Sequence, residues 1–188
     1  VAYDSTTTYG LTAVNTAAAK WNSAQSKIPL QYSTVGGDIL VYDRSLPSGT
    51  LGGTANYSQA CNSFCYGYRN ECNGTCFDEA AMYYSDVVLD AAQINATASA
   101  MGVSSTTFAT AIITHELGHS MQLDHSNPMV LDGRCSEIGS VMFPTAQELL
   151  LCGGTAPTSR DTSGINAVYP SRPPYCEICG NYCYSDPC

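Results

Sequence analysis

The chain has 188 residues, of which 44% are hydrophobic; this is enough for one buried core and does not require a second domain. Sixteen acidic residues against seven Lys and Arg give a formal net charge of -9, which argues against nucleic acid and anionic membrane surfaces as partners. No run of about 18 apolar residues occurs, and the chain opens on a polar run, so we expect a soluble protein from which any signal segment has been removed.

Ten cysteines indicate an oxidising compartment, where five disulfides are the simplest arrangement. Three sequons, at Asn56, Asn73 and Asn95, point to the same secretory route. We therefore expect a secreted, extracellular glycoprotein that is monomeric. The cysteines fall into three groups: Cys61, Cys65, Cys72 and Cys76; Cys135 and Cys152; and Cys176, Cys179, Cys183 and Cys188.

Apolar residues every three or four positions predict a first helix over Gly10–Gln25. Short β-prone runs then predict strands, and a cysteine-rich insertion over 58–79 separates the last of them from the others. A serine cap at Ser104 or Ser105 predicts a helix that reaches His119. The predicted strands are Ile28–Tyr32, Asp38–Asp43, Leu51–Tyr57 and Tyr83–Leu89.

Residues 125–157 lack periodicity and predict loops, in which Cys135 can pair with Cys152. A last helix is predicted near Ser159, with Ile165, Val168 and Tyr169 as its apolar positions. The organisation is thus one main domain over 1–170, with a cysteine-rich C-terminal clip over 171–188. The clip's four cysteines could also bind a structural zinc ion, but in an oxidising compartment two disulfides are favoured.

All three histidines of the chain lie in one short segment, at His115, His119 and His125. Spacing by four residues places His115 and His119 on the same face of a helix, where two imidazoles can bind one zinc ion. The helix must end before His125, with a chain reversal near Gln122, if His125 is to be the third ligand. The fourth position then stays open to water, and Glu116 can act as general base on a zinc-bound water and as acid toward the leaving amine.

This segment resembles the H-E-x-x-H-x-x-G-x-x-H signature of the metzincin clan of zinc metallopeptidases, with Gln122 where the clan has glycine. A left-handed backbone at Gln122 costs about 1 kcal/mol. Ser140-Val-Met142-Phe-Pro144 is similar to the clan's Met-turn, which places Met142 beneath the histidines, although a methionine is also an ordinary core residue. Its proline, together with His125-Ser126 and the segment from Asp161 to Tyr169, resembles the matrixin branch, in which a second acidic residue stands where this chain has Arg160.

The resemblance implies an α+β fold: a single metzincin-like, disulfide-rich catalytic domain with a twisted, mostly parallel sheet, helices, a zinc cleft and a loop-rich C-terminal part. By analogy, the segment from Leu51 to Ala55 is the edge strand that binds extended substrate, through Gly52, Gly53, Thr54 and Ala55. Tyrosines beside the insertion form a recognition surface or pack on disulfides. They are Tyr57, Tyr66, Tyr68, Tyr83 and Tyr84.

We therefore predict a secreted endopeptidase that holds one Zn²⁺ ion and hydrolyses extended protein or peptide substrates. Two alternatives stay open. One is a non-catalytic recognition module that keeps zinc for structure and binds a protein or glycan through its cysteine-rich insertion. The other is a protease restricted to one partner protein.

Overall fold

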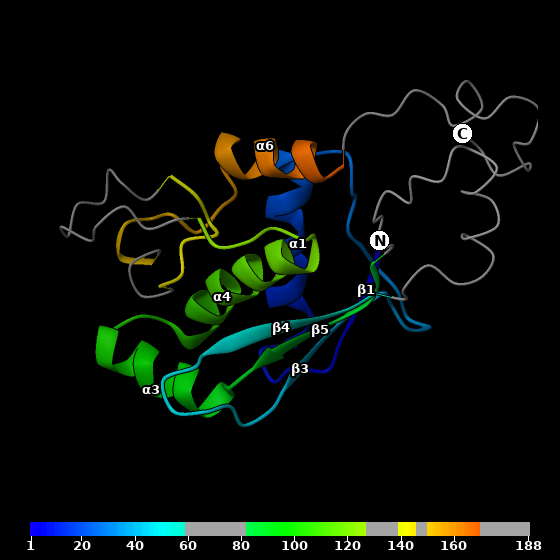
Figure 1. The fold of residues 1–188 in the computed structure, drawn as a ribbon. Helices are drawn as coiled ribbons and strands as arrows, with labels where there is room; N and C mark the ends of the chain where they lie inside the picture. The colour runs from blue at the N-terminus through cyan, green and yellow to red at the C-terminus, as the bar shows by residue number, and fades with distance from the viewer. Residues whose placement is uncertain (59–81, 127–138, 146–149, 170–188) are drawn as a thin grey trace, which may run out of the picture.

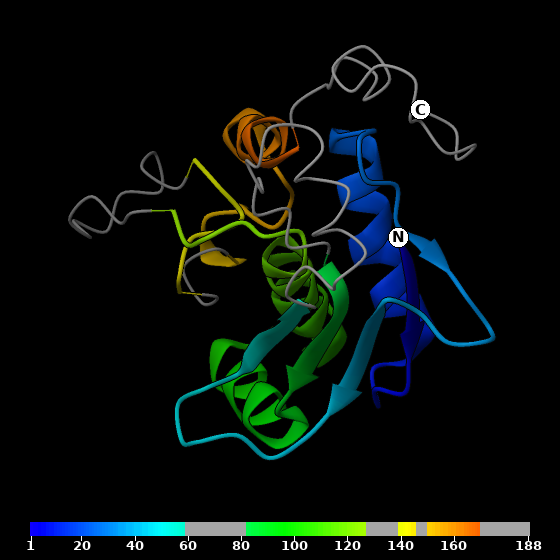
Figure 2. The ribbon, with the colours of Figure 1, turned by 45° about the vertical axis from the view of Figure 1, so that its right-hand side comes forward.

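The protein, described here from a computed structural model over residues 1–58, 82–126, 139–145 and 150–169, has an α+β fold (Figure 1). Its sheet has the strand order β2-β1-β3-β5-β4. Parallel pairs join β1 to β2 and β3, and β3 to β5, whereas β4 runs antiparallel to β5 (Figure 2). The predicted mostly parallel sheet is therefore confirmed, with β4 at one edge. The strands are β1 (Ala2–Ser5), β2 (Gln31–Tyr32), β3 (Ile39–Asp43), β4 (Gly52–Ser58) and β5 (Met82–Leu89).

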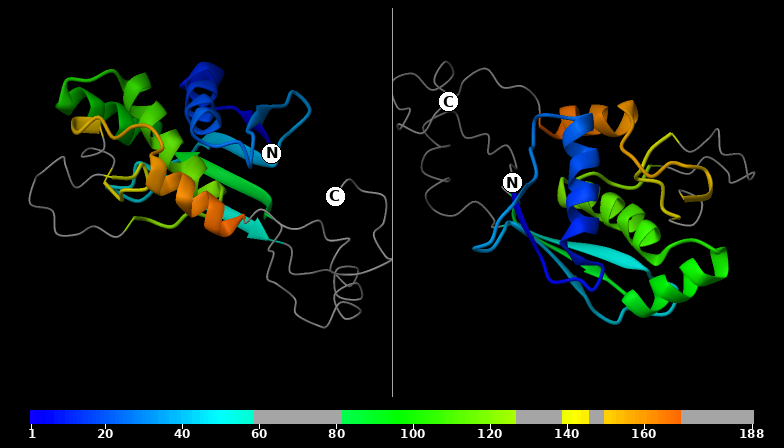
Figure 3. Two further views of the ribbon diagram at one scale, coloured as in Figure 1. Left: turned by 90° about the horizontal axis from the view of Figure 1, so that it is seen from above. Right: turned by 180° about the vertical axis from the view of Figure 1, so that it is seen from behind.

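Helices α1 and α4 pack against each other on the same face of the sheet, and α6 lies beyond them (Figure 3). The helices are α1 (Gly10–Ala24), α3 (Ala91–Met101), α4 (Ser105–Ser120) and α6 (Ser159–Val168). Buried apolar side chains from α1, α4 and the sheet form one cluster, whose largest member is Trp21. Trp21 Nε1 donates to the carbonyl of Thr114 at 2.7 Å, so α1 fixes the helix turn that precedes His115.

Three predicted helices and three predicted strands occur at the expected places. The prediction of a strand over Ile28–Tyr32 is wrong except for Gln31–Tyr32. Side chains at the end of α1 form hydrogen bonds with the backbone of residues 28–30 instead. Gln25 accepts from Ile28 N at 2.9 Å, and Asn22 accepts from Leu30 N at 2.8 Å. Because these amides already have partners, they are not available to a strand ladder.

The last helix buries Ile165, as predicted, but Val168 is 38% exposed, so that part of the predicted apolar face is wrong. Among the elements listed above, β1 and α3 were not predicted. Strand β1 has only one buried residue, Tyr3, in a polar sequence, and α3 buries only Ile94 and Ala98. Such short apolar patterns give a weak periodic signal.

Some sequence predictions lie outside the described residues. They are the insertion over 58–79 beyond its first residue, the C-terminal clip, and all cysteines except Cys152. The predicted disulfides therefore stay predictions. None of the helices in the described ranges combines the length and the hydropathy needed to cross a bilayer.

Candidate metal centre

Helix α4 carries His115, Glu116 and His119 in its C-terminal half, which is buried in the hydrophobic core. Its N-cap is Ser104, whose hydroxyl accepts from Thr107 N at 3.4 Å, as the serine pattern predicted. His115 and Glu116 are 7% and 6% exposed, and His119 is half-buried. The helix thus places two imidazoles and one carboxylate along the same cleft.

The chain reverses after α4 in the way the histidine spacing requires. Leu123 N donates to Gly118 O at 3.0 Å and Gln122 N to His119 O at 2.9 Å, the bond pair of a Schellman motif. Gln122 occupies its left-handed position with φ 65°, although it is not glycine. The helix ends at Ser120, and the reversal returns His125 to the other two imidazoles.

The Nε2 atoms of the three histidines converge. His115 Nε2 lies 3.1 Å from His119 Nε2 and 3.2 Å from His125 Nε2. Ligands of a tetrahedral zinc, each about 2.0–2.1 Å from the ion, lie roughly 3.3 Å apart. Within the described part of the chain, these three side chains are the group that can hold a metal ion.

Hydrogen bonds at Nδ1 fix two of the rings in the tautomer that a metal needs. His115 Nδ1 lies 2.8 Å from Val141 O, and His119 Nδ1 lies 2.7 Å from Leu123 O. A carbonyl can only accept, so each Nδ1 carries the proton and each neutral ring turns an Nε2 lone pair toward the other. Burial lowers the pKa of His115 to about 4 and also lowers the pKa of His119, so burial favours the neutral form of both rings. A cation between the rings would remove the repulsion between these lone pairs.

Glu116 lines the same cleft as the histidines, and its carboxylate is bonded to strand β4. Thr54 Oγ1 donates to Glu116 Oε2 at 2.7 Å. Burial raises the pKa of Glu116 to about 7, while the hydrogen bond from Thr54 opposes this rise. A carboxyl with this pKa can exchange a proton near neutral pH.

The cleft has a volume of about 770 Å³ and runs along β4. Gly52, Gly53 and Thr54, predicted as substrate contacts, line it, whereas Ala55 is not among its lining residues. Gly52 also permits the close approach of β4 to α4, because a Cβ there would lie 2.7 Å from Ile112 Cγ2. Sequence reasoning identified this strand but missed the contact between Thr54 and Glu116.

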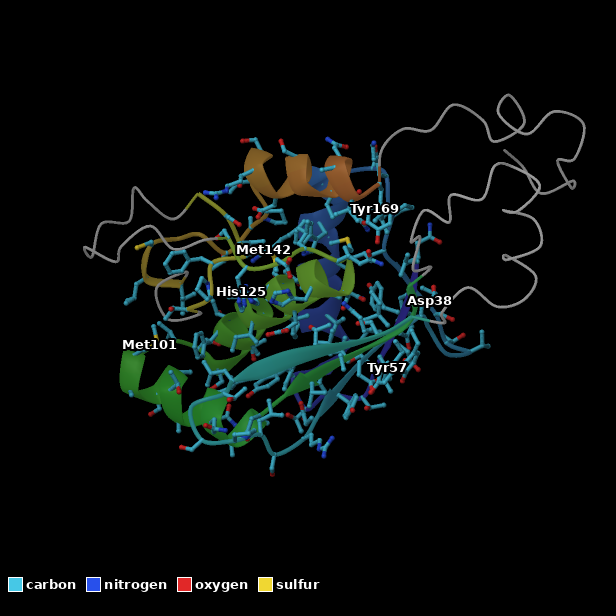
Figure 4. All side chains as sticks on the ribbon, in the orientation of Figure 1. Asp38, Tyr57, Met101, His125, Met142 and Tyr169 are labelled. Atoms are coloured by element: carbon cyan, nitrogen blue, oxygen red, sulfur yellow. The ribbon has the colours of Figure 1, made fainter. Side chains whose placement is uncertain are left out.

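The segment around Met142, which resembles a Met-turn, lies against both the helix and the loop that carry the histidines. Figure 4 shows Met142 next to His125, and Ser126 N donates to Met142 O at 2.9 Å. Met142 is 2% exposed and packs against Gly118, where a Cβ would lie 2.2 Å from its sulfur. The glycine between His115 and His119 is therefore needed for this packing.

A buried carboxylate holds this turn from the side of α6. Asp161 accepts from the Ser140 hydroxyl, from Val141 N at 3.1 Å and from Thr158 N at 2.7 Å. Val141 in turn supplies the carbonyl that orients His115. Asp161 therefore acts on the metal site through the backbone of Val141, a role that the sequence analysis did not assign.

The far face of the sheet carries tyrosines, two of which belong to the predicted recognition surface. The rings of Tyr57 and Tyr84 lie 5.7 Å apart, and the hydroxyl of Tyr57 lies 3.5 Å from Asp86 Oδ2. Figure 4 shows Tyr57 on the side of β4 away from His125. These tyrosines are therefore not part of the metal centre.

Comparison with protein-family models gives no match for this chain, and comparison with curated proteins gives none either.

Proposed function

We propose that this protein is a secreted, zinc-dependent endopeptidase that cleaves extended polypeptide segments. The observation that carries the proposal is the convergence of three Nε2 atoms, two of them lone-pair donors by their Nδ1 bonds, in a cleft that a buried glutamate also lines. The likeness of the sequence to the metzincin signature supports the same reading.

Zinc fits the donor set best. Three neutral imidazoles suit zinc, and a site with three protein ligands leaves a position for water or substrate, unlike closed structural sites with four. His115, His119 and His125 would hold the ion, and bound zinc would polarise a water molecule and the scissile carbonyl.

Glu116 is the residue that moves protons in this proposal. Its carboxylate accepts the proton of the attacking water and then delivers it to the leaving amine, so that no covalent bond to the enzyme forms. Its raised pKa, about 7, suits a group that takes up and releases a proton in one cycle. Met142 supports the floor of the site from beneath.

Strand β4 is the proposed binding edge for the substrate. Asp90 N donates to Leu51 O at 2.9 Å. Because bonds alternate along an antiparallel ladder, the N–H and C=O groups of Gly52, Thr54 and Asn56 then point away from β5, toward the edge of the sheet. An extended peptide can pair with these groups whatever its side chains are.

The test is cleavage of unfolded casein by the purified protein, with and without a zinc chelator, beside the Glu116→Gln variant. We expect chelator-sensitive cleavage by the wild type, and loss of at least about 100-fold of the activity in Glu116→Gln with zinc retained. Full activity in Glu116→Gln would contradict the proposed mechanism.

The two alternatives predict different results. A non-catalytic recognition module would bind zinc and cleave no protein. A protease restricted to one partner would leave casein intact and cleave a protein in the medium or tissue from which the enzyme comes.

A further inference from the structure

One face of strand β4 is bonded to the helix that carries the metal ligands. Side chains at alternate positions of a strand share a face, and Thr54 and Asn56 both point toward α4. Thr54 Oγ1 lies 2.7 Å from Glu116 Oε2, and Asn56 Nδ2 donates to His119 O at 2.8 Å. The edge strand that is proposed to bind substrate therefore also contacts the proposed base.

The Glu116 carboxylate has a different neighbour at each oxygen. Among the described residues, Thr54 supplies the side-chain hydrogen bond, at Oε2. Oε1 faces Gly52, where a Cβ would lie only 3.2 Å away. One oxygen is thus held while the other lies beside a residue without a side chain, and residue Glu116 as a whole is 6% exposed.

Threonine is suited to holding a carboxylate in one orientation. Its β-branched side chain has restricted χ1 freedom, so the hydroxyl direction is set by the strand backbone. Glutamate has three side-chain torsions, and a bond to one oxygen limits the orientations that it can adopt. The same hydroxyl lies 3.0 Å from Glu116 O, but the carboxylate is the closer and, when ionised, the stronger acceptor.

We infer that Thr54 is a positioning residue for Glu116: its hydroxyl holds the carboxylate where it can accept a proton from the attacking water. The inference rests on the proposed endopeptidase function. In the proposed pairing, the substrate bonds to the backbone of Thr54 and not to its hydroxyl. Loss of the hydroxyl should therefore affect kcat, whereas KM depends on the backbone.

The experiment compares Thr54→Val, which keeps the shape and removes the hydroxyl, with Thr54→Ser, which keeps the hydroxyl. Thr110→Val is the matched control, because Thr110 lies on the same helix as Glu116 and its hydroxyl donates at 2.7 Å to Thr106 O, its one side-chain hydrogen bond among the described residues. For each protein we would measure kcat and KM on one quenched peptide, bound zinc, and the melting temperature.

We expect Thr54→Val to lower kcat roughly 10- to 100-fold with KM within about twofold of wild type. Bound zinc should be unchanged, Thr54→Ser should recover most of kcat, and Thr110→Val should keep wild-type kcat. If Thr54→Val does not fold, Thr54→Ala is compared with Thr54→Ser in its place.

Wild-type kcat in Thr54→Val would overturn the inference while leaving the proposed function intact. An equal loss in Thr54→Ser, or a loss that follows zinc content, would overturn it as well. If the wild type itself cleaves no peptide, the proposed function fails and the inference fails with it.

Discussion

His115 and His119 differ from His125 in what holds them in place. The first two project from α4, which packs on α1 and the sheet, and each donates Nδ1–H to a backbone carbonyl. His125 follows the turn after the helix and is exposed. The site thus has a helix half fixed by the hydrophobic core and a loop half fixed by backbone hydrogen bonds and by Asp161.

The two halves meet at Val141, whose carbonyl orients His115 and whose amide is bonded to Asp161. A ligand on the helix therefore depends on a carboxylate from α6, far along the chain. Rigidity of the helix half alone therefore does not orient its imidazoles, because His115 also needs the carbonyl of Val141.

The largest expected effect is on the loop half. Asp161→Ala leaves Ser140, Val141 N and Thr158 N without their buried acceptor, and we expect it to lower the free energy of unfolding by about 3 kcal/mol. Zinc affinity should fall roughly 10- to 100-fold, as for other groups that orient a ligand. Chemical denaturation and competition with a chelator measure the two quantities.

The control for this substitution is Thr162→Ala, since within the described ranges the Thr162 hydroxyl bonds only Ser159 O, at 3.0 Å. Unchanged zinc affinity in Asp161→Ala, with the loss of stability present, would show that the two halves are independent.

The next effect concerns the contact between Gly118 on the helix and Met142 on the loop. In Gly118→Ala the new methyl would lie 2.2 Å from Met142 Sδ and 2.9 Å from Trp21 Cζ2. We expect a net loss of about 1–2 kcal/mol, since overpacking outweighs the gain in helix propensity. Urea denaturation measures it, with Gly139→Ala as control because a Cβ there meets no atom of the described residues within 4 Å. If Gly118→Ala and Gly139→Ala were equally stable, the space between Gly118 and Met142 would accommodate a methyl group, and the expectation would be wrong.

An effect of similar size is expected at the turn between the two halves. Gln122 has φ 65°, a conformation that a β-branched side chain adopts at a greater cost than glutamine does. We expect Gln122→Val to be less stable than Gln122→Gly by about 1–2 kcal/mol, measured as the difference in the free energy of unfolding. The reverse order would be incompatible with a left-handed residue at this position.

The smallest effect lies away from the site, at the N-cap of α3. Hydrogen bonds from the Gln93 side chain, Leu46 N and Gln93 N lower the pKa of Asp90 to about 2, from an ordinary value of 3.8. Its contribution to stability is full above about pH 4 and is lost as the pH falls through about 2. Asp90→Asn should therefore be less stable than wild type at pH 5, and the difference should shrink toward pH 2. A difference that is constant over this range would contradict the assignment.

The helix half was predictable from the sequence because local rules govern it. Histidines four residues apart share a helix face, and the need to return His125 predicted the turn at Gln122, which the structure confirms. Helix α3 was missed although Asp90 and Gly102 are ordinary N-cap and C-cap residues, because the sequence between them has little amphipathic pattern.

The dependence of the site on distant residues was not predictable. Thr54, Asp161 and Val141 act through contacts between segments far apart in the chain, and a single sequence carries no periodic signal for such contacts. The resemblance to a Met-turn located Met142, but it did not indicate that Gly118 packs on its sulfur or that Asp161 holds the turn.

The central claim is that the three histidines bind one zinc ion through Nε2 while His115 and His119 keep their protons on Nδ1. The most direct measurement is a zinc titration of the metal-free protein, followed by imidazole ¹⁵N NMR. The account predicts saturation at about one zinc per chain, with ligation shifts at Nε2 of all three rings and retained Nδ1–H signals for His115 and His119. No binding of zinc, or binding that leaves the three Nε2 signals unchanged, would contradict it.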